Sequence, residues 1–251
     1  MIRVGITGSS GFIARHITEA LQQKKGAARI KLFYFDLPDN NILDQKAVKK
    51  FVKNKDVLIH AAAVNRGTDA EIIAGSVVGT YNLAVALKGR KNKPKIVFLS
   101  STQAALDSVY GLSKRLAERI LEDFSKRNKA PVAVLRLPNV FGEGAKTFYN
   151  TVVATFCYQA AHNKDLTIHK NSKNKKLNLI YVKDAARIIF NEVFKKNKNK
   201  FVLKEISAAN EIKVDALAKV IQSFGLLKNN APLKSKFYKD LYKTYLFYAN
   251  G

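Results

Sequence analysis

The chain has 251 residues, and its 44 Lys and Arg against 19 Asp and Glu give a formal net charge of +25. The hydrophobic content of 47% is ordinary for a globular protein, and a single cysteine, Cys157, excludes an internal disulfide and fits a reducing cytoplasm. The lysines are scattered and no aromatic platforms lie between them, so we expect a solvated basic surface and no nucleic-acid partner. No run of about 18 apolar residues is apparent, so we expect no transmembrane helix and no membrane partner.

Residues 2–7 are apolar and predict a short strand that leads into a glycine-rich turn. Gly8 permits the tight turn, and Gly11 lets the backbone approach a pyrophosphate. The amides at the start of the next helix, which extends to Leu21, then bind the phosphate charge. A glycine pattern between a strand and a helix predicts dinucleotide binding. The cofactor residues expected here are Gly8, Ser10, Gly11, Phe12 and Ile13.

A second strand is predicted over residues 29–35, and it ends at Asp36. An acid at this position accepts hydrogen bonds from both hydroxyls of the adenosine ribose and repels a 2′-phosphate. Asp36 therefore favours NADH over NADPH, and its alternative role is to cap the turn before Leu37-Pro38. Residues 41–44 then form a loop that we expect along the adenine, followed by a helix that ends near residues 51–52.

Residues 56–63 predict a buried parallel strand that runs into small side chains, which let the backbone crowd a cofactor. The small residues assigned to the cofactor are Ala61, Ala62 and Ala63. Asn65 and Arg66 follow at the carboxyl end of the sheet, where ligands bind in such folds, and they are candidates for substrate binding. A surface salt bridge is the alternative role for Arg66.

A helix over residues 72–87 and a buried strand over 95–99 follow, and the strand ends in Ser-Ser-Thr at 100–102. The next helix has Tyr110 and Lys114 one turn apart, so that they share a face. A phenol beside an ammonium is expected to have a lowered pKa and to exchange a proton with an oxygen near neutral pH. The apolar positions that predict this helix are Leu112, Leu116, Ile120, Leu121 and Phe124.

Strand and helix alternate as far as a further strand at 130–137, which predicts an α/β fold of the Rossmann type, a doubly wound parallel sheet. After Pro138 the alternation weakens into mixed helical stretches such as 152–161 and 214–224. We expect a single unit with a small C-terminal substrate-binding lobe. Its dinucleotide-binding core comprises residues 1–137 and 177–195, and its lobe comprises residues 138–176 and 196–251.

Four motifs together resemble the extended short-chain dehydrogenase/reductases that act on nucleotide sugars. They are Thr7-Gly8-x-x-Gly11-Phe12-Ile13, Ser-Ser-Thr at 100–102, Tyr110-x-x-x-Lys114, and Arg136-Leu137-Pro138-Asn139-Val140-Phe141-Gly142. Residues 179–186 also resemble a late strand-to-helix motif of that family. The resemblance extends over nearly the whole chain.

Three further stretches, residues 63–66, 154–158 and 239–246, are similar to the CapF-type reductases of capsular polysaccharide synthesis. This resemblance implies reduction at C4 of a UDP-2-acetamido-2,6-dideoxy-hexos-4-ulose, a UDP-sugar of an L-FucNAc-type pathway. In CapF-type enzymes a metal-binding cupin domain follows and epimerises the sugar, and we expect only the reductase half to carry over. The resemblance favours NADPH, whereas Asp36 favours NADH. The expected cofactor is therefore NAD(P)H, and the choice between the two forms stays open.

The resemblance implies that Lys114 holds the nicotinamide ribose and that Tyr110 protonates the C4 oxygen as hydride arrives. It also implies that Thr102 donates a hydrogen bond to that oxygen, with a strand-end hydroxyl as the alternative role. Gln103 and Ala104 cannot supply the acid and base that a 4,6-dehydratase needs, which disfavours dehydration. Gln103 is instead a candidate for substrate binding.

Asn139 follows a strand end and is a candidate for binding the sugar or a phosphate, with a turn role as its alternative. No metal site is predicted, because the histidines have no ligand spacing and Cys157 is in an apolar stretch. The four histidines are His16, His60, His162 and His169.

Other functions stay open at this stage. An NAD-dependent nucleotide-sugar 4-epimerase uses the same Tyr, Lys and Ser/Thr and lets the keto sugar rotate. A non-catalytic redox sensor or nucleic-acid binder is a third hypothesis, motivated by the charge of +25. The helices at 72–87 and 112–124 are candidates for pairing in a homodimer.

Overall fold

The computed structural model describes residues 1–23, 30–168, 172–207, 210–226 and 235–250, so Arg29 of the predicted second strand and His169 lie outside the described residues. The chain divides into two compact units. The first comprises Met1–Leu137 and Ala186–Ile206, and the second comprises Pro138–Ala185 and Ser207–Gly251. The glycine-rich turn, Tyr110 and Lys114 therefore belong to the first unit.

The first unit is built on a six-stranded sheet with the order β2-β1-β3-β4-β5-β8. Its strands are β1 (Ile2–Thr7), β2 (Ile30–Phe35), β3 (Val57–His60), β4 (Lys95–Ser101), β5 (Val132–Leu137) and β8 (Phe201–Glu205). All neighbouring strands pair in parallel. The order changes direction at β1, which has β2 on one side and β3 on the other, and ligands bind at such a switch point. The predicted doubly wound parallel sheet is confirmed.

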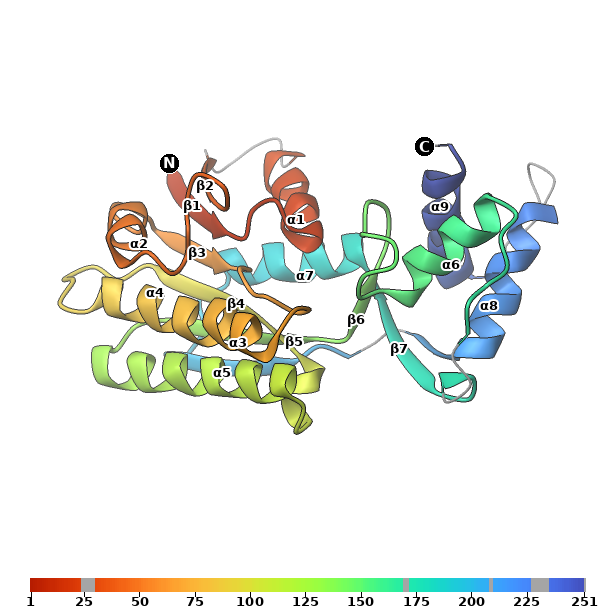
Figure 1. Ribbon diagram of the computed structural model, residues 1–251. Coiled ribbons are helices and arrows are strands. Elements are labelled where there is room, and N and C mark those ends of the chain that lie inside the picture. The colour runs from red at the N-terminus through yellow and green to blue at the C-terminus, as the bar shows by residue number, and fades with distance from the viewer. Residues whose placement is uncertain (24–29, 169–171, 208–209, 227–234, 251) are drawn as a thin grey trace. The chain divides into compact units, whose positions relative to one another are not determined.

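Helices cover both faces of this sheet (Figure 1). On one face lie α1 (Phe12–Gln23) and α7 (Val182–Phe194), whose residues from Ala186 onward belong to this unit. On the other face, α2 (Gln45–Phe51), α4 (Gly79–Leu87) and α5 (Val109–Asn128) enclose a hydrophobic core.

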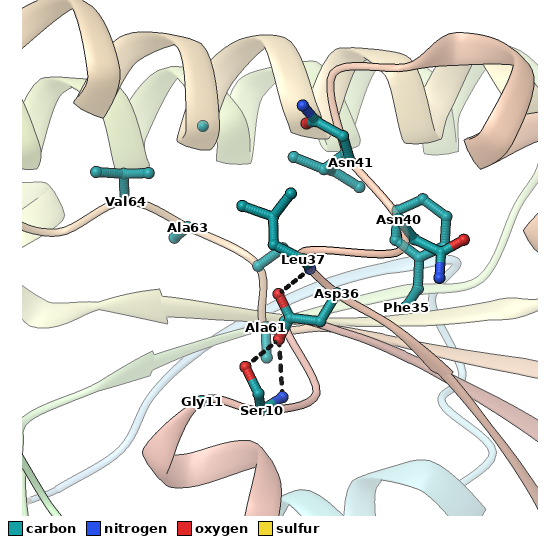
Figure 2. A pocket seen from close by; sticks show the side chains of 14 residues that line it. Ser10, Gly11, Phe35, Asp36, Leu37, Asn40, Asn41, Ala61, Ala63 and Val64 are labelled. Carbon is teal, nitrogen blue, oxygen red and sulfur yellow. Dashed lines mark hydrogen bonds between the residues drawn. The ribbon is translucent and has the colours of Figure 1, made fainter.

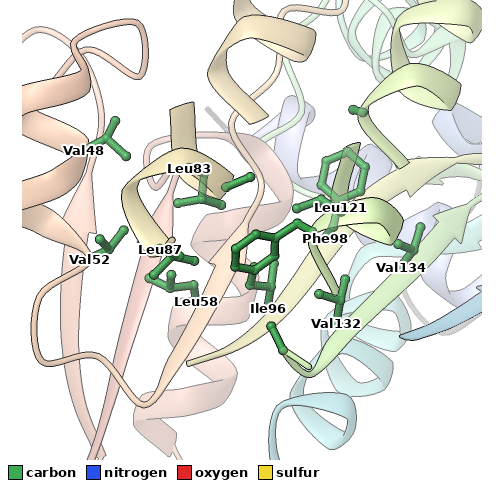
Figure 3. Close-up of a cluster of buried hydrophobic side chains, with 14 of the residues drawn as sticks. Val48, Val52, Leu58, Leu83, Leu87, Ile96, Phe98, Leu121, Val132 and Val134 are labelled. Atoms are coloured by element: carbon green, nitrogen blue, oxygen red, sulfur yellow. The ribbon is translucent and has the colours of Figure 1, made fainter. Parts of the chain in front are cut away.

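Figure 3 shows this core, in which Ile96 and Phe98 of β4 lie among the leucines of α4 and α5. Leu83, Leu87 and Leu121 have no exposed surface. Burying each such side chain contributes about 1.5–3 kcal/mol, which keeps the helices fixed against the sheet. The carboxyl ends of the strands are thus held on a rigid support.

The apolar helix predicted at 72–87 begins earlier and is not uniform. It comprises α3 (Asp69–Ile73), a π-helical turn (Ala74–Val78) and α4. Among the described residues, Asp69–Leu87 alone is long and apolar enough to cross a membrane by length and composition, with a mean hydropathy of 1.4. This corrects the expectation that the chain has no such stretch. Half of that window is buried inside the protein.

The helix α5 forms as predicted, and charged residues share its buried face with apolar ones. Leu112 and Leu116 are 46% and 51% exposed, whereas Lys114 and Glu118 are only 4% and 3% exposed. The later apolar positions Leu121 and Phe124 are buried. In the structure the face of α5 toward the sheet also carries small residues and the charged residues Lys114 and Glu118. These two charged side chains make hydrogen bonds to groups at the end of β4.

The second unit contains a three-stranded sheet with the order β6-β7-β9. The strands are β6 (Asn139–Phe141), β7 (Lys176–Tyr181) and β9 (Asn210–Lys213), and β7 is parallel to β6 and antiparallel to β9. The helices of this unit are α6 (Val152–Ala161), α8 (Val214–Ser223) and α9 (Lys236–Ala249), with a 3-10 turn at Phe224–Leu226. Cys157 on α6 is fully buried, as expected for a core residue.

The observed units differ from the sequence-based division in two segments. Residues 177–185 group with the second unit because β7 pairs with β6 and β9. Residues 196–206 group with the first unit because β8 extends the large sheet beside β5.

Candidate active site

The turn after β1 is closed by Gly8, whose φ of +67° lies in the left-handed region that favours glycine. A Cβ atom here would lie 2.6 Å from the backbone nitrogen of Ala62, so glycine is needed for this close approach. The Gly8 amide donates to the carbonyl of Phe35 at 2.9 Å. The ends of β1, β2 and β3 are thereby drawn together where the strand order changes direction.

A cavity of about 270 Å³ lies at this edge of the sheet (Figure 2). Its walls come from the turn after β1, the end of β2 with the loop that follows, and the segment after β3. The predicted cofactor residues that line it are Gly8, Ser10, Gly11, Asp36, Ala61, Ala62 and Ala63. Phe12 and Ile13 are partly buried in the first turn of α1.

Asp36 is held in this cavity by hydrogen bonds to its carboxylate (Figure 2). Its Oδ2 atom accepts from the Ser10 amide at 2.8 Å and from the Ser10 hydroxyl at 2.6 Å, and its Oδ1 atom accepts from the Leu37 amide at 2.9 Å. Hydrogen bonds to an ionised group are stronger than neutral ones, so this carboxylate has a fixed position. A fixed negative charge in the cavity attracts hydroxyl donors and repels phosphate.

The loop after β2 is fastened to α4 by Asn82, which is 2% exposed. The Asn82 amide nitrogen donates to the carbonyls of Ile42 and Leu43, each at 3.1 Å, and its oxygen accepts from Gln45 at 3.1 Å. A Cβ atom at Gly79 would lie 3.0 Å from Ile42, which shows how closely the loop approaches the helix. Asn82 thus supports the loop that the sequence analysis placed along the adenine.

The π-helical turn supplies Gly75 to the cavity wall, a residue that the sequence analysis did not single out. A Cβ atom at Gly75 would lie 2.4 Å from the Val64 side chain, which also lines the cavity. An isolated glycine inside an apolar helical pattern is a signal of such close packing.

Lys114 is almost completely buried at the carboxyl end of β4. Its Nζ atom donates to the Leu99 carbonyl at 3.0 Å and lies 5.1 Å from the centre of the Phe98 ring. Burial lowers the pKa of Lys114 to about 8, and the nearby Glu118 carboxylate opposes this shift. Lys114 therefore keeps its proton at neutral pH but releases it far more readily than an exposed lysine.

Tyr110 corrects the expectation of a lowered phenol pKa. Burial raises the pKa of Tyr110 to about 12, and a hydrogen bond with Ser101 opposes the shift. The Lys114 Nζ atom lies 5.9 Å from the Tyr110 ring centre and is bonded to the Leu99 carbonyl, so desolvation outweighs the cation. Tyr110 is protonated at neutral pH and is suited to donating a proton.

Ser101 is a further candidate for the site that the sequence analysis did not single out, because it assigned the donor role to Thr102. Ser101 is the last residue of β4 and makes the hydrogen bond to Tyr110, whereas Thr102 begins a 3-10 turn (Thr102–Ala105). Successive strand residues point to opposite faces, and Ser100 on the other face contacts Glu118. This alternation is the signal that singles out Ser101 from its neighbours.

The start of α5 is pressed against that turn. A Cβ atom at Gly111 would lie 2.4 Å from the carbonyl oxygens of Gln103 and Leu106. The Ser108 hydroxyl accepts from the Gly111 amide at 3.1 Å and caps the helix. Tyr110 is therefore positioned by a capped helix end and a glycine that permits close packing.

The candidates for substrate binding have exposed side chains. Asn65 and Arg66 are exposed just beyond the cavity-lining segment, and Gln103 is exposed on the 3-10 turn after β4. Asn139 is exposed at the start of β6, in the second unit.

His60 has a structural role at the end of β3. Its ring is completely buried, with Nδ1 2.7 Å from the Thr7 hydroxyl and Nε2 2.9 Å from the Thr80 hydroxyl. Burial lowers the pKa of His60 to about 3, with a smaller contribution from Lys114, so the ring is neutral. No group of three or more His, Cys, Asp or Glu that could hold a metal ion is found among the described residues.

Residues 4–200 match the model of the NAD dependent epimerase/dehydratase family. The chain is 30% identical over 249 residues to a UDP-2-acetamido-2,6-beta-L-arabino-hexul-4-ose reductase of Pseudomonas aeruginosa, covering 98% of this chain and 64% of that protein. It is 27% identical to a UDP-N-acetyl-alpha-D-glucosaminuronate decarboxylase of Bacillus cytotoxicus, covering 72% of this chain and 68% of that protein.

Among solved structures, the capsular polysaccharide assembling protein CapF of Staphylococcus aureus is similar with a TM-score of 0.78 and 26% identity, covering 98% of this chain and 65% of that chain. A UDP-glucuronic acid 4-epimerase of Bacillus cereus in complex with NAD has a TM-score of 0.85 at 15% identity, covering 99% of both chains, and it supports the fold alone. The present chain thus spans less than two thirds of the length of the reductase and of CapF.

Proposed function

Because the chain belongs to the NAD dependent epimerase/dehydratase family, we propose that it is an NADH-dependent 4-ketoreductase of a UDP-2-acetamido-2,6-dideoxy-hexos-4-ulose. The observation that carries the proposal is the buried pair of Tyr110 and Lys114, in which the phenol keeps its proton at neutral pH. A protonated donor suits reduction, in which an oxygen must gain a proton. The similarity to the P. aeruginosa reductase and to CapF supports the choice of substrate.

The cavity residues fit the adenosine and pyrophosphate of a dinucleotide. The amides at the start of α1 suit the charge of a pyrophosphate. The missing Cβ atom at Gly8 leaves room for a close approach of the backbone. Asp36 would bind the adenosine ribose, with residues 61–63 beside the cofactor. The carboxylate of Asp36 supports NADH over NADPH, because a 2′-phosphate would meet its negative charge.

When bound, NADH would supply the hydride that reduces C4 of the sugar. Tyr110 would give the proton of its hydroxyl to the C4 oxygen, so that the ketone becomes a secondary alcohol. The ammonium of Lys114 would stabilise the phenolate left behind. Ser101 and Thr102, at the end of β4, would provide hydroxyl donors to the same oxygen.

Substrate binding completes the proposed site. We assign Asn65, Arg66, Gln103 and Asn139 to the UDP-sugar, whose phosphates and hydroxyls suit guanidinium and amide side chains. The distribution of positive charge over the chain supports attraction of an anionic nucleotide sugar.

The proposed enzyme would act in the cytoplasm as a homodimer. The large apolar side chains exposed on neighbouring helices α3, α4 and α5 and on the π-helical turn support this assembly. They are Ile73, Val78, Tyr81, Leu112 and Leu116. A second copy would cover this apolar surface, and sedimentation of the purified chain would detect the dimer.

Loss of nicotinamide absorbance tests the activity, with purified protein, NADH and the UDP-4-keto-6-deoxy-HexNAc substrate. We expect Tyr110→Phe to reduce turnover by about 100-fold or more while it retains NADH binding. Equal rates for the wild type and Tyr110→Phe would contradict the proposal. Tightly co-purifying NAD with no net turnover of the cofactor would indicate a nucleotide-sugar 4-epimerase instead.

A further inference from the structure

A second buried charged group lies on α5 one turn after Lys114. The Glu118 carboxylate is 3% exposed, and it accepts from the Ser100 hydroxyl at 2.5 Å. Its Oε1 atom also accepts from Arg136 Nε at 2.9 Å, and its Oε2 atom accepts from Arg136 Nη2 at 2.7 Å. This two-point contact fixes the planes of both side chains. Glu118 is thereby fastened to the ends of both β4 and β5.

The surroundings of Lys114 give this carboxylate an electrostatic effect. The titratable groups that act on the Lys114 ammonium or face it are Tyr110 and Glu118 on α5 and His60 on β3, with Arg136 of β5 beyond Glu118. Tyr110 keeps its proton and His60 is neutral at neutral pH, so neither supplies a negative charge. Glu118 supplies one, in a position where water does not screen it.

We propose that Glu118, with Arg136 and Ser100, is a positioning residue that keeps the Lys114 ammonium charged and directed at the end of β4. The proposal rests on the proposed function in that Lys114 is taken as part of the catalytic pair. Arg136 modulates the effect, because it neutralises part of the Glu118 charge while it holds the carboxylate in place. Removing the charge of Glu118 and removing the charge of Arg136 therefore change the electrostatic potential at Lys114 in opposite directions.

If the ion pair of Glu118 and Arg136 were purely structural, the expected result would be different. It would fasten α5 to the sheet, and the loss of either partner would lower stability by leaving a buried charge unpaired. The titration of Lys114 would then stay in place or move in the same direction in both variants. The sign of the shift therefore separates positioning of the ammonium from simple support of the fold.

A direct test follows the side-chain nitrogen resonance of Lys114 in protein labelled with ¹⁵N-lysine, with the signal assigned by its loss in Lys114→Met. Lys114 titrates near pH 8 in the wild type. We expect Glu118→Gln to lower this midpoint by about one pH unit and Arg136→Gln to raise it by a smaller amount. Unchanged midpoints, or shifts of the same sign, would overturn the proposal.

Glu122→Gln is the matched control. Glu122 is one turn further along α5 and pairs with Arg119 and Lys126 at 2.7 and 2.8 Å, both of which are exposed. Like Glu118, Glu122 is a glutamate paired with basic side chains, but its partners are exposed to solvent. We therefore expect Glu122→Gln to leave the Lys114 midpoint within error of the wild type. A shift as large as that of Glu118→Gln would show that any charge change on α5 has this effect, and it would overturn the specific role of Glu118.

The pH dependence of the reduction rate then connects the pair to function. We expect the rate to fall at high pH with the Lys114 midpoint, about one unit earlier in Glu118→Gln and slightly later in Arg136→Gln. Shifted resonances in a protein that never oxidises NADH would refute the proposed function and leave the Glu118 inference standing. Reduction with identical pH profiles in all variants would refute the inference and leave the function standing.

Discussion

The Oδ2 atom of Asp36 accepts two hydrogen bonds from Ser10, one from its amide at 2.8 Å and one from its hydroxyl at 2.6 Å. The end of β2 is thereby bonded to the glycine-rich turn after β1, at the point where the strand order changes direction. This pair fixes a negative charge in the cavity and leads to the first prediction, which concerns the choice of cofactor.

Asp36→Asn should reduce the preference for NADH over NADPH by about tenfold or more, because hydrogen bonds to a charged group contribute about 1.5–3 kcal/mol. The ratio of kcat/KM for the two cofactors measures this preference. Asp39→Asn removes an exposed carboxylate three residues later and is the control, with an unchanged ratio expected. A wild-type enzyme that prefers NADPH would contradict the assigned role of Asp36.

Gly8→Ala should lower both stability and affinity for NADH, because its Cβ atom would lie 2.6 Å from the Ala62 backbone. Gly89→Ala is a matched control: Gly89 also has a positive φ, of +70°, but nothing lies within 4 Å of its Cβ position. Both variants carry the left-handed backbone cost of about 1–2 kcal/mol. Thermal unfolding and NADH titration should show an additional loss only for Gly8→Ala, and equal losses would refute the steric account.

Asn82→Ala should weaken NADH binding more than it slows turnover. The substitution removes both hydrogen bonds to the loop carbonyls of Ile42 and Leu43, and each such hydrogen bond contributes about 0.5–1.5 kcal/mol. Gln45→Ala removes only the bond to the Asn82 side-chain oxygen and should have a smaller effect. Steady-state kinetics over a range of NADH concentrations tests this, and a fall in kcat with an unchanged KM would count against it.

Lys114 gives a prediction for stability as a function of pH. Its folded-state pKa of about 8 lies below the ordinary lysine value of 10.5, so the unfolded chain binds more protons between these values. Unfolding free energy therefore rises with pH through this window, and the cost of the buried ammonium is fully present below pH 8. Relative to Lys114→Met, the wild type should gain on the order of 2–3 kcal/mol between pH 8 and pH 10.

Denaturant unfolding of the wild type and Lys114→Met at a series of pH values checks this prediction. Using the difference between the two proteins removes the contributions of other titrating groups. A difference that is constant across the window would show that Lys114 has an ordinary pKa. Lys114→Met should also be the more stable protein at neutral pH, although it lacks activity.

Local patterns were enough to predict five of the six strands of the large sheet, most of the helices that cover it and the position of the cavity. The glycine turn, Asp36 and Ala61 to Ala63 follow strand ends, and parallel strands bring such ends to one edge. The strand β8 was missed because its five residues follow a Lys- and Asn-rich stretch, and its place beside β5 depends on long-range pairing.

The errors at the candidate site have a common physical origin. Leu112 and Leu116 contributed to the apolar pattern that predicts the helix, but they are exposed. The buried side chains of Lys114 and Glu118 bond to groups at the end of β4, which hydrophobic periodicity does not reveal. The pKa of Tyr110 was predicted from its neighbour Lys114, whereas burial decides it. Ser101 was not singled out, although the alternation of side chains along β4 separates it from Ser100. The sequence therefore predicts which residues meet, and three-dimensional burial determines their protonation.

The most direct measurement of the central claim is isotope transfer from NADH deuterated at the nicotinamide C4 position. When the deuterium is on the transferred face of the nicotinamide, we predict that the UDP-sugar product carries deuterium at C4 of the sugar. NMR would show this as the loss of the signal of the proton on C4. Tyr110→Phe should show this transfer only at a greatly reduced rate. A product formed at normal rates without deuterium at C4 from either labelled face of the cofactor would contradict the account.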